Sequence, residues 1–250
     1  MSAGARARVA LASFYVLHHR PWRDTSRMLE VLTRDHGRLT LFARGVRGPR
    51  SQTASLLQPF RALLGSWSAR GDAGQLTQVE NDPGLPIGAQ LPSAALLPAW
   101  YLNELLLQLT LRNDPQPEVF DLYHSTLETL RAGSAVEPAL RRFERRLLEL
   151  QGYGIDFTRD ARTGESLRAD TYYHFHPELG FVATAASSAS VFSGHALQAI
   201  AAERWEDAAV WEEARRLMRG MIDHALEGRE LRTRAVARAV GQRSRREDTQ

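Results

Sequence analysis

The sequence predicts an α+β chain in which a small, closed N-terminal β-sheet precedes a mainly α-helical region. Two observations support this prediction. Apolar side chains alternate with a period of two through roughly the first eighty residues, and they recur at helical spacing after residue 98. Between these regions, the segment 81–98 is rich in proline, which favours a linker or the entry to a helix. A chain of 250 residues can hold one large domain or two to three smaller ones.

The N-terminal strands are short and closely spaced. Asp35-His36-Gly37 separates the second strand from the third, and a short loop that ends in glycine is typical of a hairpin. Five such strands in about eighty residues match the size of an OB-fold, although an SH3-like barrel would give nearly the same pattern. The expected strands are 7–19, 27–34, 38–44, 59–68 and 75–80.

The rest of the chain follows the helical period or interrupts it. The helix expected at 99–112 is apolar nearly all round, as a buried helix would be. Apolar stripes predict further helices at 118–131, 138–151 and about 207–226, with a short helix after Ser193-Gly194. The expected domains are a barrel at 1–81, a helical domain at 82–151, an irregular insertion at 152–190, C-terminal helices at 191–240 and a disordered tail at 241–250.

The composition excludes several classes of protein. The sequence has no cysteine and no lysine, so all 32 basic residues are arginine. It therefore has no thiolate metal site, cysteine nucleophile, Schiff-base lysine or standard ATP-binding P-loop. No Ser-His-Asp or HExxH pattern is evident, no apolar run is long enough for a membrane span, and the N-terminal segment lacks a cleavage site. We expect a cytoplasmic protein with no cofactor and no catalytic residues.

Positive charge is concentrated at the two ends of the chain. Residues 1–80 carry 12 arginines against 5 acidic residues, whereas residues 81–228 carry 13 against 21. The stretch 36–71 contains no acidic residue. A basic head and tail around an acidic middle favour contact with a polyanion at the ends.

The third expected strand has the most informative pattern. Side chains alternate along a strand, so Arg38, Thr40, Phe42 and Arg44 share one face, and a basic loop follows. Arginines interleaved with an aromatic ring suit a nucleic acid, because guanidinium groups neutralise phosphates and a ring stacks on a base. The alternative is a solvated strand edge that charge protects from pairing.

Motifs along nearly the whole chain resemble the RecO family of bacterial recombination mediators. Each motif alone is modestly specific, but their number and order together identify the family. They are YVLHHRPWRDTS (15–26), LTRDHGRLTLFARGVRGPRS (32–51), LQPFRALLGSW (57–67), YLNELLLQL (101–109), DPQPEVFDLYHSTLETL (114–130), PALRRFERRLLELQGYGIDF (138–157), FSGHALQAI (192–200) and the basic run at 214–234.

The resemblance implies an N-terminal OB-fold, a helical domain and a zinc-finger-like insertion. It implies a protein of DNA repair and homologous recombination, associated with the nucleoid, that binds single- and double-stranded DNA and anneals complementary strands. It also implies that RecR and the C-terminal tail of single-stranded-DNA-binding protein (SSB) are partners. The purpose would be to load RecA onto SSB-coated single strands.

The resemblance also bears on individual residues. Arg38, Arg44, Arg47 and Arg50 are expected to contact DNA phosphates independently of sequence. Phe42 and Trp22 are candidates to stack on bases, but aromatic residues of a small barrel are more often core. Arg232, Arg234 and Arg238 either extend the DNA path or only solubilise the C-terminal end.

The motif ALRRFE supplies the expected SSB-tail site. The resemblance implies that its first arginine, Arg141, receives the tail's carboxylate, with Arg142 beside it. A planar guanidinium can bind a carboxylate through two parallel hydrogen bonds. The alternative is an ordinary arginine face that pairs with Glu144 or Glu149 at helical spacing.

One departure from the family concerns metal. Many members hold zinc with four cysteines after the GYG motif, whereas residues 158–175 contain none. We expect no bound zinc and an insertion held by packing and turns, with His174 and His176 at most half of a metal site.

Other functions remain open at this stage. Asp156, Asp160 and Glu165, or Asp170 with His174, could form a metal-dependent nuclease centre, but acidic residues in such loops are more often turn residues. A non-enzymatic RNA-binding or protein-only adaptor is the other alternative.

Overall fold

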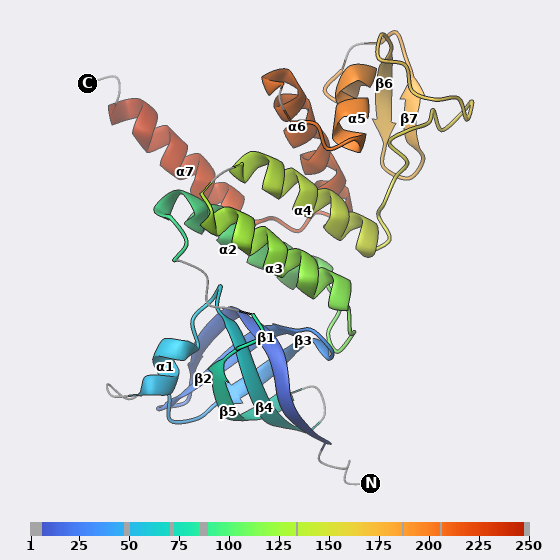
Figure 1. The fold of residues 1–250 in the computed structure, drawn as a ribbon. Coiled ribbons are helices and arrows are strands. Elements are labelled where there is room, and N and C mark those ends of the chain that lie inside the picture. The colour runs from blue at the N-terminus through green and yellow to red at the C-terminus, as the bar shows by residue number, and fades with distance from the viewer. Residues whose placement is uncertain are drawn as a thin grey trace. The chain divides into compact units, whose positions relative to one another are not determined.

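The computed structural model describes residues 7–47, 51–70, 73–85, 90–133, 135–186, 188–205 and 207–247. The chain forms two compact units, shown in Figure 1. Unit 1 comprises Met1–Gly133 with Leu231–Gln250, and unit 2 comprises Ser134–Glu230. This division falls inside the segment 82–151, which the sequence pattern treats as one helical domain.

Unit 1 begins with a closed five-stranded barrel, as predicted. Its strands are β1 (Ala7–Trp22), β2 (Ser26–Thr33), β3 (Gly37–Ala43), β4 (Ala62–Arg70) and β5 (Ala73–Asn81). They pair in the order β1-β2-β3-β5-β4 and close between β4 and β1. The parallel pairing of β3 with β5 is the crossover that makes the barrel OB-like.

The strand β1 is buried on both faces. Phe14 and Val16 lie in the barrel core, together with Leu29, Leu41 and Trp67. On the other face, the ring centroid of Tyr15 lies 5.0 Å from that of Tyr123 and 5.3 Å from that of Phe120, both on a helix. This explains the near-continuous apolar run of β1, because a strand with two buried faces need not alternate.

A bulge interrupts the expected alternation of β1. The register between β1 and β4 shifts between Val9 and Ala12, and Leu11 has φ +51° and is 54% exposed. The Leu11 N–H donates to Ser66 Oγ at 3.1 Å instead of to a strand carbonyl. A bulge inserts one extra residue, so the side chain of Leu11 points outward. Regular alternation along the strand would place it on the same face as Val9 and Tyr15.

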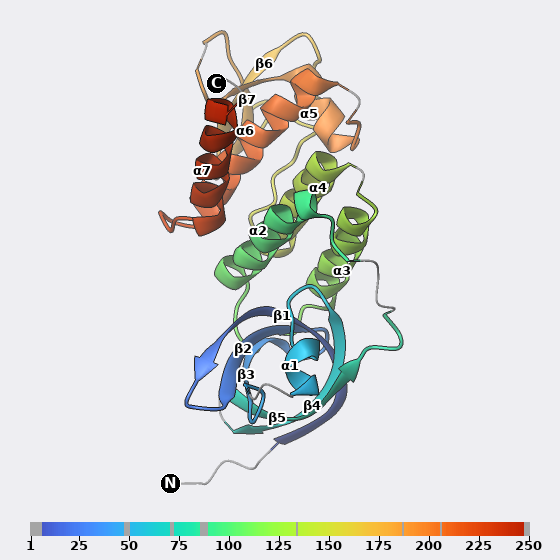
Figure 2. The same cartoon turned by 90° about the vertical axis from the view of Figure 1, so that its left-hand side faces the viewer.

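The helices of unit 1 are α1 (Gln52–Leu56), α2 (Ser93–Leu109), α3 (Pro117–Arg131) and α7 (Arg232–Glu247). Figure 2 shows α1 in front of the ring of strands, where Leu57 and Val46 join the barrel core. The sequence pattern contains no signal for α1, and it places the start of α2 six residues too late. Pro98 lies inside α2, in its second turn, and no side chain caps the first turn.

The helix α7 returns to α2 from the end of the chain. The carboxylate of Glu104 on α2 accepts the backbone N–H groups of Arg232 and Thr233 at 2.7 and 2.9 Å, and the Thr233 hydroxyl at 2.6 Å. A carboxylate at a helix N-terminus accepts hydrogen bonds from the backbone N–H groups that have no partner within the helix. Its negative charge also interacts favourably with the helix dipole. The helix then runs through the first residues of the segment expected to be a disordered tail.

Unit 2 combines three helices with a small sheet. The helices are α4 (Val136–Leu150), α5 (Gly194–Ala201) and α6 (Ala208–Ala225), and the strands are β6 (Tyr172–His176), β7 (Gly180–Ala183) and β8 (Val191–Ser193). The sheet order is β7-β6-β8. Arg145 on α4 donates to the carbonyl of Ile200 at 2.9 Å, which satisfies the end of α5.

Side chains cover both edges of this sheet. At β7, Asp160 Oδ2 accepts the Ala183 N–H at 2.8 Å. At β8, Glu213 Oε2 accepts the Ser193 N–H at 2.7 Å, and Arg216 donates to the Val191 carbonyl at 2.7 Å. Unpaired strand edges invite association with another chain, and these contacts close them. In the described residues, the segment 152–190, where a zinc-finger-like insertion is expected, contains β6, β7 and a turn built on Asp160.

Among the residues that the structure describes, no helix combines the length and the apolar character that a membrane crossing requires.

Candidate nucleic-acid interface

The outer face of β3 carries the side chains that the alternation predicts. Leu39, Leu41 and Ala43 are buried in the barrel core. Arg38, Thr40 and Phe42 therefore point away from the core, and Arg44 follows on the exposed surface.

Arg38 is held by partners within unit 1. Its guanidinium donates to Thr110 Oγ1 at 3.1 Å, to the Thr110 carbonyl at 2.8 Å and to Glu30 Oε2 at 3.4 Å. Its side chain is 11% exposed. Burial, and then the charge of Arg112, lowers its pKa despite Glu30. Arg38 thus joins β3 to the segment after α2, and its contact with DNA stays a prediction.

Glu30 is the centre of this buried network. Both of its oxygens accept from Arg112 at 2.8 Å, and Oε1 also accepts the Thr40 hydroxyl at 3.0 Å. Two guanidinium groups therefore share one carboxylate that is 12% exposed. The arrangement leaves the positive charge of this region only partly neutralised.

Trp22 and Phe42 form an exposed aromatic pair at the end of the barrel sheet. Their ring centroids are 5.2 Å apart with an interplanar angle of 46°, and Trp22 is 39% exposed. Arg20 and Met28 are register partners across β1 and β2, and Met28 is also the partner of Phe42 on β3. Neither ring belongs to the barrel core; Trp22 is exposed and Phe42 is partly buried.

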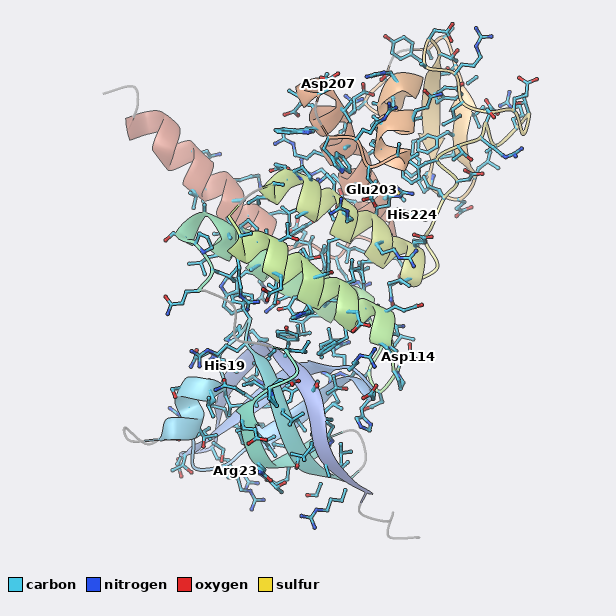
Figure 3. The ribbon with its side chains drawn as sticks, viewed as in Figure 1. His19, Arg23, Asp114, Glu203, Asp207 and His224 are labelled. Carbon is cyan, nitrogen blue, oxygen red and sulfur yellow. The ribbon has the colours of Figure 1, made fainter. Side chains whose placement is uncertain are left out.

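Two arginines of the predicted basic loop lie at the surface next to the β1–β2 turn. Arg44 and Arg47 are both exposed. The Arg47 backbone N–H donates to the Thr25 carbonyl at 3.0 Å, and its guanidinium donates to the Arg23 carbonyl at 3.0 Å. Figure 3 labels Arg23, which has φ +51° in this turn. Arg50 lies outside the described residues.

A recess of about 270 Å³ opens beside this loop. Its lining comes from β1, β2, the loop after β3 and α1, and comprises His19, Pro21, Arg27, Val46, Arg47 and Ala54. Partial burial, followed by the charges of Arg27 and His18, lowers the pKa of His19 (labelled in Figure 3). Sequence reasoning missed His19 and Arg27, because no motif joins residues on four different elements.

The arginines of the expected SSB-tail site differ in accessibility. The Arg141 side chain is 9% exposed, and its Nη2 lies 3.0 Å from Oε1 of Glu144. Arg142 is half exposed, and its Nε donates to Glu203 Oε2 at 2.7 Å (Figure 3 labels Glu203). Arg141 thus makes the helical-spacing pair that the sequence left open as an alternative. Whether either arginine receives a carboxylate of a partner stays a prediction.

The C-terminal arginines lie on the first turns of α7. Arg232 and Arg238 are exposed, whereas Arg234 is partly buried. Val236 and Val240 on the same helix are 50% and 54% exposed. The described part of α7 thus presents arginines together with apolar side chains, and its contact with DNA also stays a prediction.

The acidic residues and histidines of unit 2 have structural partners. Asp156 accepts the Thr158 N–H at 2.7 Å, and Asp170 pairs with Arg168 at 3.0 Å. His174 Nδ1 lies 3.1 Å from His176 Nε2. In the described ranges, no group of three or more histidine or acidic side chains could hold a metal ion. The acidic residues act here as turn and loop residues.

Two family models together match most of the chain. Residues 9–81 match the model of the recombination protein O N-terminal domain, and residues 94–235 match that of the recombination protein O C-terminal domain. The barrel and most of the helices thus fall within one family's two domains.

Several curated relatives span the same length. The DNA repair protein RecO of Methylococcus capsulatus is 42% identical over 94% of this chain and 96% of its own. Those of Azoarcus sp. and Nitrosococcus oceani are each 39% identical, over 92% and 96% of this chain and 96% and 99% of their own. By the two domain matches and this full-length similarity, the chain belongs to the RecO family.

Proposed function

We propose that this protein acts in DNA repair and recombination by binding single- and double-stranded DNA through its barrel and annealing complementary strands. The observation that carries the proposal is that the exposed Trp22 ring, packed against the partly buried Phe42 ring, lies with Arg44 and Arg47 at one end of the barrel. The names of the curated relatives, each a DNA repair protein, support the same conclusion.

The chemistry of this surface accounts for both kinds of DNA. Arginines that neutralise phosphates release counterions from both single strands and duplexes, and this contribution does not depend on base sequence. Ring stacking requires an unpaired base, so it adds affinity for single strands only. Annealing then needs no chemical step, because the surface only has to hold one strand extended while a second strand pairs with it.

The proposed partners follow from membership of the family. The protein would work with RecR to load RecA onto SSB-coated single strands, and the SSB tail would dock on unit 2. Arg142 is the more accessible receptor for the tail, since Arg141 is buried against Glu144. An incoming carboxylate could replace Glu203 on Arg142 without exposing a buried charge.

The test compares single- and double-stranded DNA binding of a variant that carries both Trp22→Ala and Phe42→Ala. We expect single-strand affinity to fall about tenfold or more, because stacking contributes about 1–3 kcal/mol per base. Double-strand affinity should change little. Tyr172→Ala, which removes an aromatic side chain that is 59% exposed on unit 2, is the matched control.

Competition between DNA and RNA tests the two alternative functions, an RNA-binding protein and a protein-only adaptor. Fluorescence anisotropy of a labelled DNA strand should show displacement by unlabelled DNA at lower concentration than by RNA of the same sequence. Stronger displacement by RNA would favour an RNA-binding protein, and no binding of either strand would favour a protein-only adaptor.

A further inference from the structure

The recess beside the basic loop has a lining that suits a specific ligand. On β2, Arg27 precedes the core residue Leu29 by two positions, so it lies on the same face at the open end of the barrel. Pro21 is its register partner on β1. Ala54 on α1 and Arg47 in the loop complete the opposite wall.

The described residues that line the recess carry only positive charge. They include the guanidinium groups of Arg27 and Arg47, and none of them is acidic. Arg27 directs one N–H to the Ala54 carbonyl at 3.4 Å, and Arg47 directs one to the Arg23 carbonyl at 3.0 Å. A guanidinium carries five N–H donors in a planar fork, so each group can also bind a phosphate.

The remaining lining is apolar or neutral. Pro21 and Ala54 offer surfaces that a base can contact without hydrogen bonds, whereas Val46 is buried in the barrel core. Burial, together with Arg27 and His18, lowers the pKa of His19, so the imidazole is mostly neutral at pH 7 and can donate and accept hydrogen bonds. Such a lining suits a ligand with an anionic end and a planar, polar-edged end.

The size of the recess also limits the ligand. A volume of about 270 Å³ corresponds to about nine water molecules at about 30 Å³ each. This is larger than a single inorganic ion and smaller than a folded segment of protein.

We propose that the recess receives one nucleotide of a single strand, with its phosphate between Arg27 and Arg47 and its unstacked base against Pro21 and Ala54. The inference rests on the proposed DNA binding and adds a strand-selective site to it. Bases of a duplex are paired and stacked, and they cannot enter without the cost of flipping. The recess therefore makes the protein prefer single strands to duplex.

The first experiment fills the recess without changing charge. Ala54→Leu places a larger side chain at its wall, while the Ala54 carbonyl that accepts from Arg27 remains. Ser55→Leu, on the exposed side of the same short helix, is the control. We expect Ala54→Leu to lower single-strand affinity about fivefold or more, with duplex affinity and the salt dependence of binding unchanged.

The second experiment removes one cation. Arg27→Gln should lower single-strand affinity and reduce the slope of log affinity against log salt by about 0.7, the loss of one phosphate contact. Arg34→Gln removes an equal charge from the barrel surface, where Arg34 pairs with Asp121, and should leave the slope unchanged. Circular dichroism must show that each variant is folded.

The outcomes distinguish this site from the proposed function. If the wild-type protein binds DNA but Ala54→Leu and Arg27→Gln bind single strands as it does, the recess takes no nucleotide, although DNA binding stands. If both variants lose single-strand and duplex affinity equally, the recess is a general phosphate contact, and strand selectivity is wrong. If the wild-type protein binds no DNA, the proposed function itself fails.

Discussion

At the scale of single residues, a few buried carboxylates organise loops and strand edges. Asp160 is 5% exposed and accepts the backbone N–H groups of Arg162, Thr163 and Ala183 at 2.8, 3.1 and 2.8 Å. Burial alone would raise its pKa, but the three backbone donors outweigh burial and lower it. A carboxylate with this arrangement fixes the conformation of the loop through its backbone N–H groups.

Asp160→Asn should destabilise the protein at neutral pH. We expect the free energy of unfolding to fall by roughly 1–3 kcal/mol, because the amide removes a charged acceptor and sets an N–H₂ group against backbone donors. The pKa of Asp160 is lowered on folding, so its contribution is present above the unfolded pKa of about 3.9 and disappears as pH falls through the folded value. Urea unfolding at pH 7 and at about pH 3 measures both effects.

The control for this prediction is Glu165→Gln, an exposed acid in the same loop. It should unfold like the wild-type protein at both pH values. If Asp160→Asn and the wild-type protein have the same free energy of unfolding at pH 7, the loop does not depend on this carboxylate.

Arg141 and Glu144 form a buried pair whose members depend on each other. Their side chains are 9% and 1% exposed. Arg141→Ala should lower the free energy of unfolding by about 3–5 kcal/mol, because a buried charge would lose its counter-ion. The double variant Arg141→Met with Glu144→Leu should be less destabilised than the single variant, as measured by thermal or urea unfolding.

This result also determines how the SSB-tail site can be tested. A loss of tail binding in Arg141→Ala would be ambiguous if unit 2 unfolds. Arg142→Ala, at a half-exposed position, should weaken binding of an SSB-tail peptide without loss of stability and without loss of annealing on naked DNA. Equal losses in peptide binding and annealing would contradict the assignment of the two tasks to different surfaces.

At the scale of elements, α7 shows how a distant side chain starts a helix. Its sequence is rich in arginine and offers no acidic residue in the first turn. The missing negative charge comes from Glu104 on α2, which binds the N–H groups of Arg232 and Thr233. The start of the helix therefore depends on a tertiary contact with a residue more than a hundred positions away in the sequence. Its own first turn has no acidic side chain that could take this place.

Glu104→Gln should loosen α7. We expect the first turns of the helix to lose about 1 kcal/mol of stabilisation, as at other lost caps. Limited digestion with trypsin should then cleave at Arg232, Arg234 or Arg238 faster than in the wild-type protein. Glu80→Gln, on the exposed side of β5, is the control. Unchanged cleavage would mean that packing of α7 on α2 suffices without the carboxylate.

At the scale of the whole molecule, the composition limits which chemistry the chain can supply. The sequence contains no lysine for a standard P-loop and no cysteine for a thiolate site. Strand annealing by such a protein would be driven only by binding and base pairing.

Annealing should therefore need neither nucleotide nor metal. We expect complementary strands to anneal at the same rate with or without ATP, and in excess EDTA. The melting temperature of the protein should also be unchanged by EDTA, and elemental analysis should find less than one zinc per chain. A requirement for ATP hydrolysis, or a melting temperature that falls with EDTA, would contradict this prediction and direct attention to His174 and His176.

The sequence by itself determined the secondary structure of most of the chain and the family. The barrel and the helices α3, α4 and α6 follow from periods of two and about 3.6 residues, which are local properties. The outward face of β3, with Phe42 and Arg44, follows from the same alternation. The basic segment and the RecO motifs are equally local, because each is read from adjacent residues.

Only the tertiary structure decided which of those residues are accessible and which act together. Arg38 and Arg44 are alike in the sequence, yet Arg38 is held by Thr110 and Glu30, whereas Arg44 is exposed. Arg141 and Arg142 are neighbours, yet only one is buried with a counter-ion. The recess joins His19, Arg27, Arg47 and Ala54 from four elements. A local pattern cannot predict these outcomes, because burial, charge pairing and the shape of a recess depend on side chains that folding brings together from distant parts of the chain.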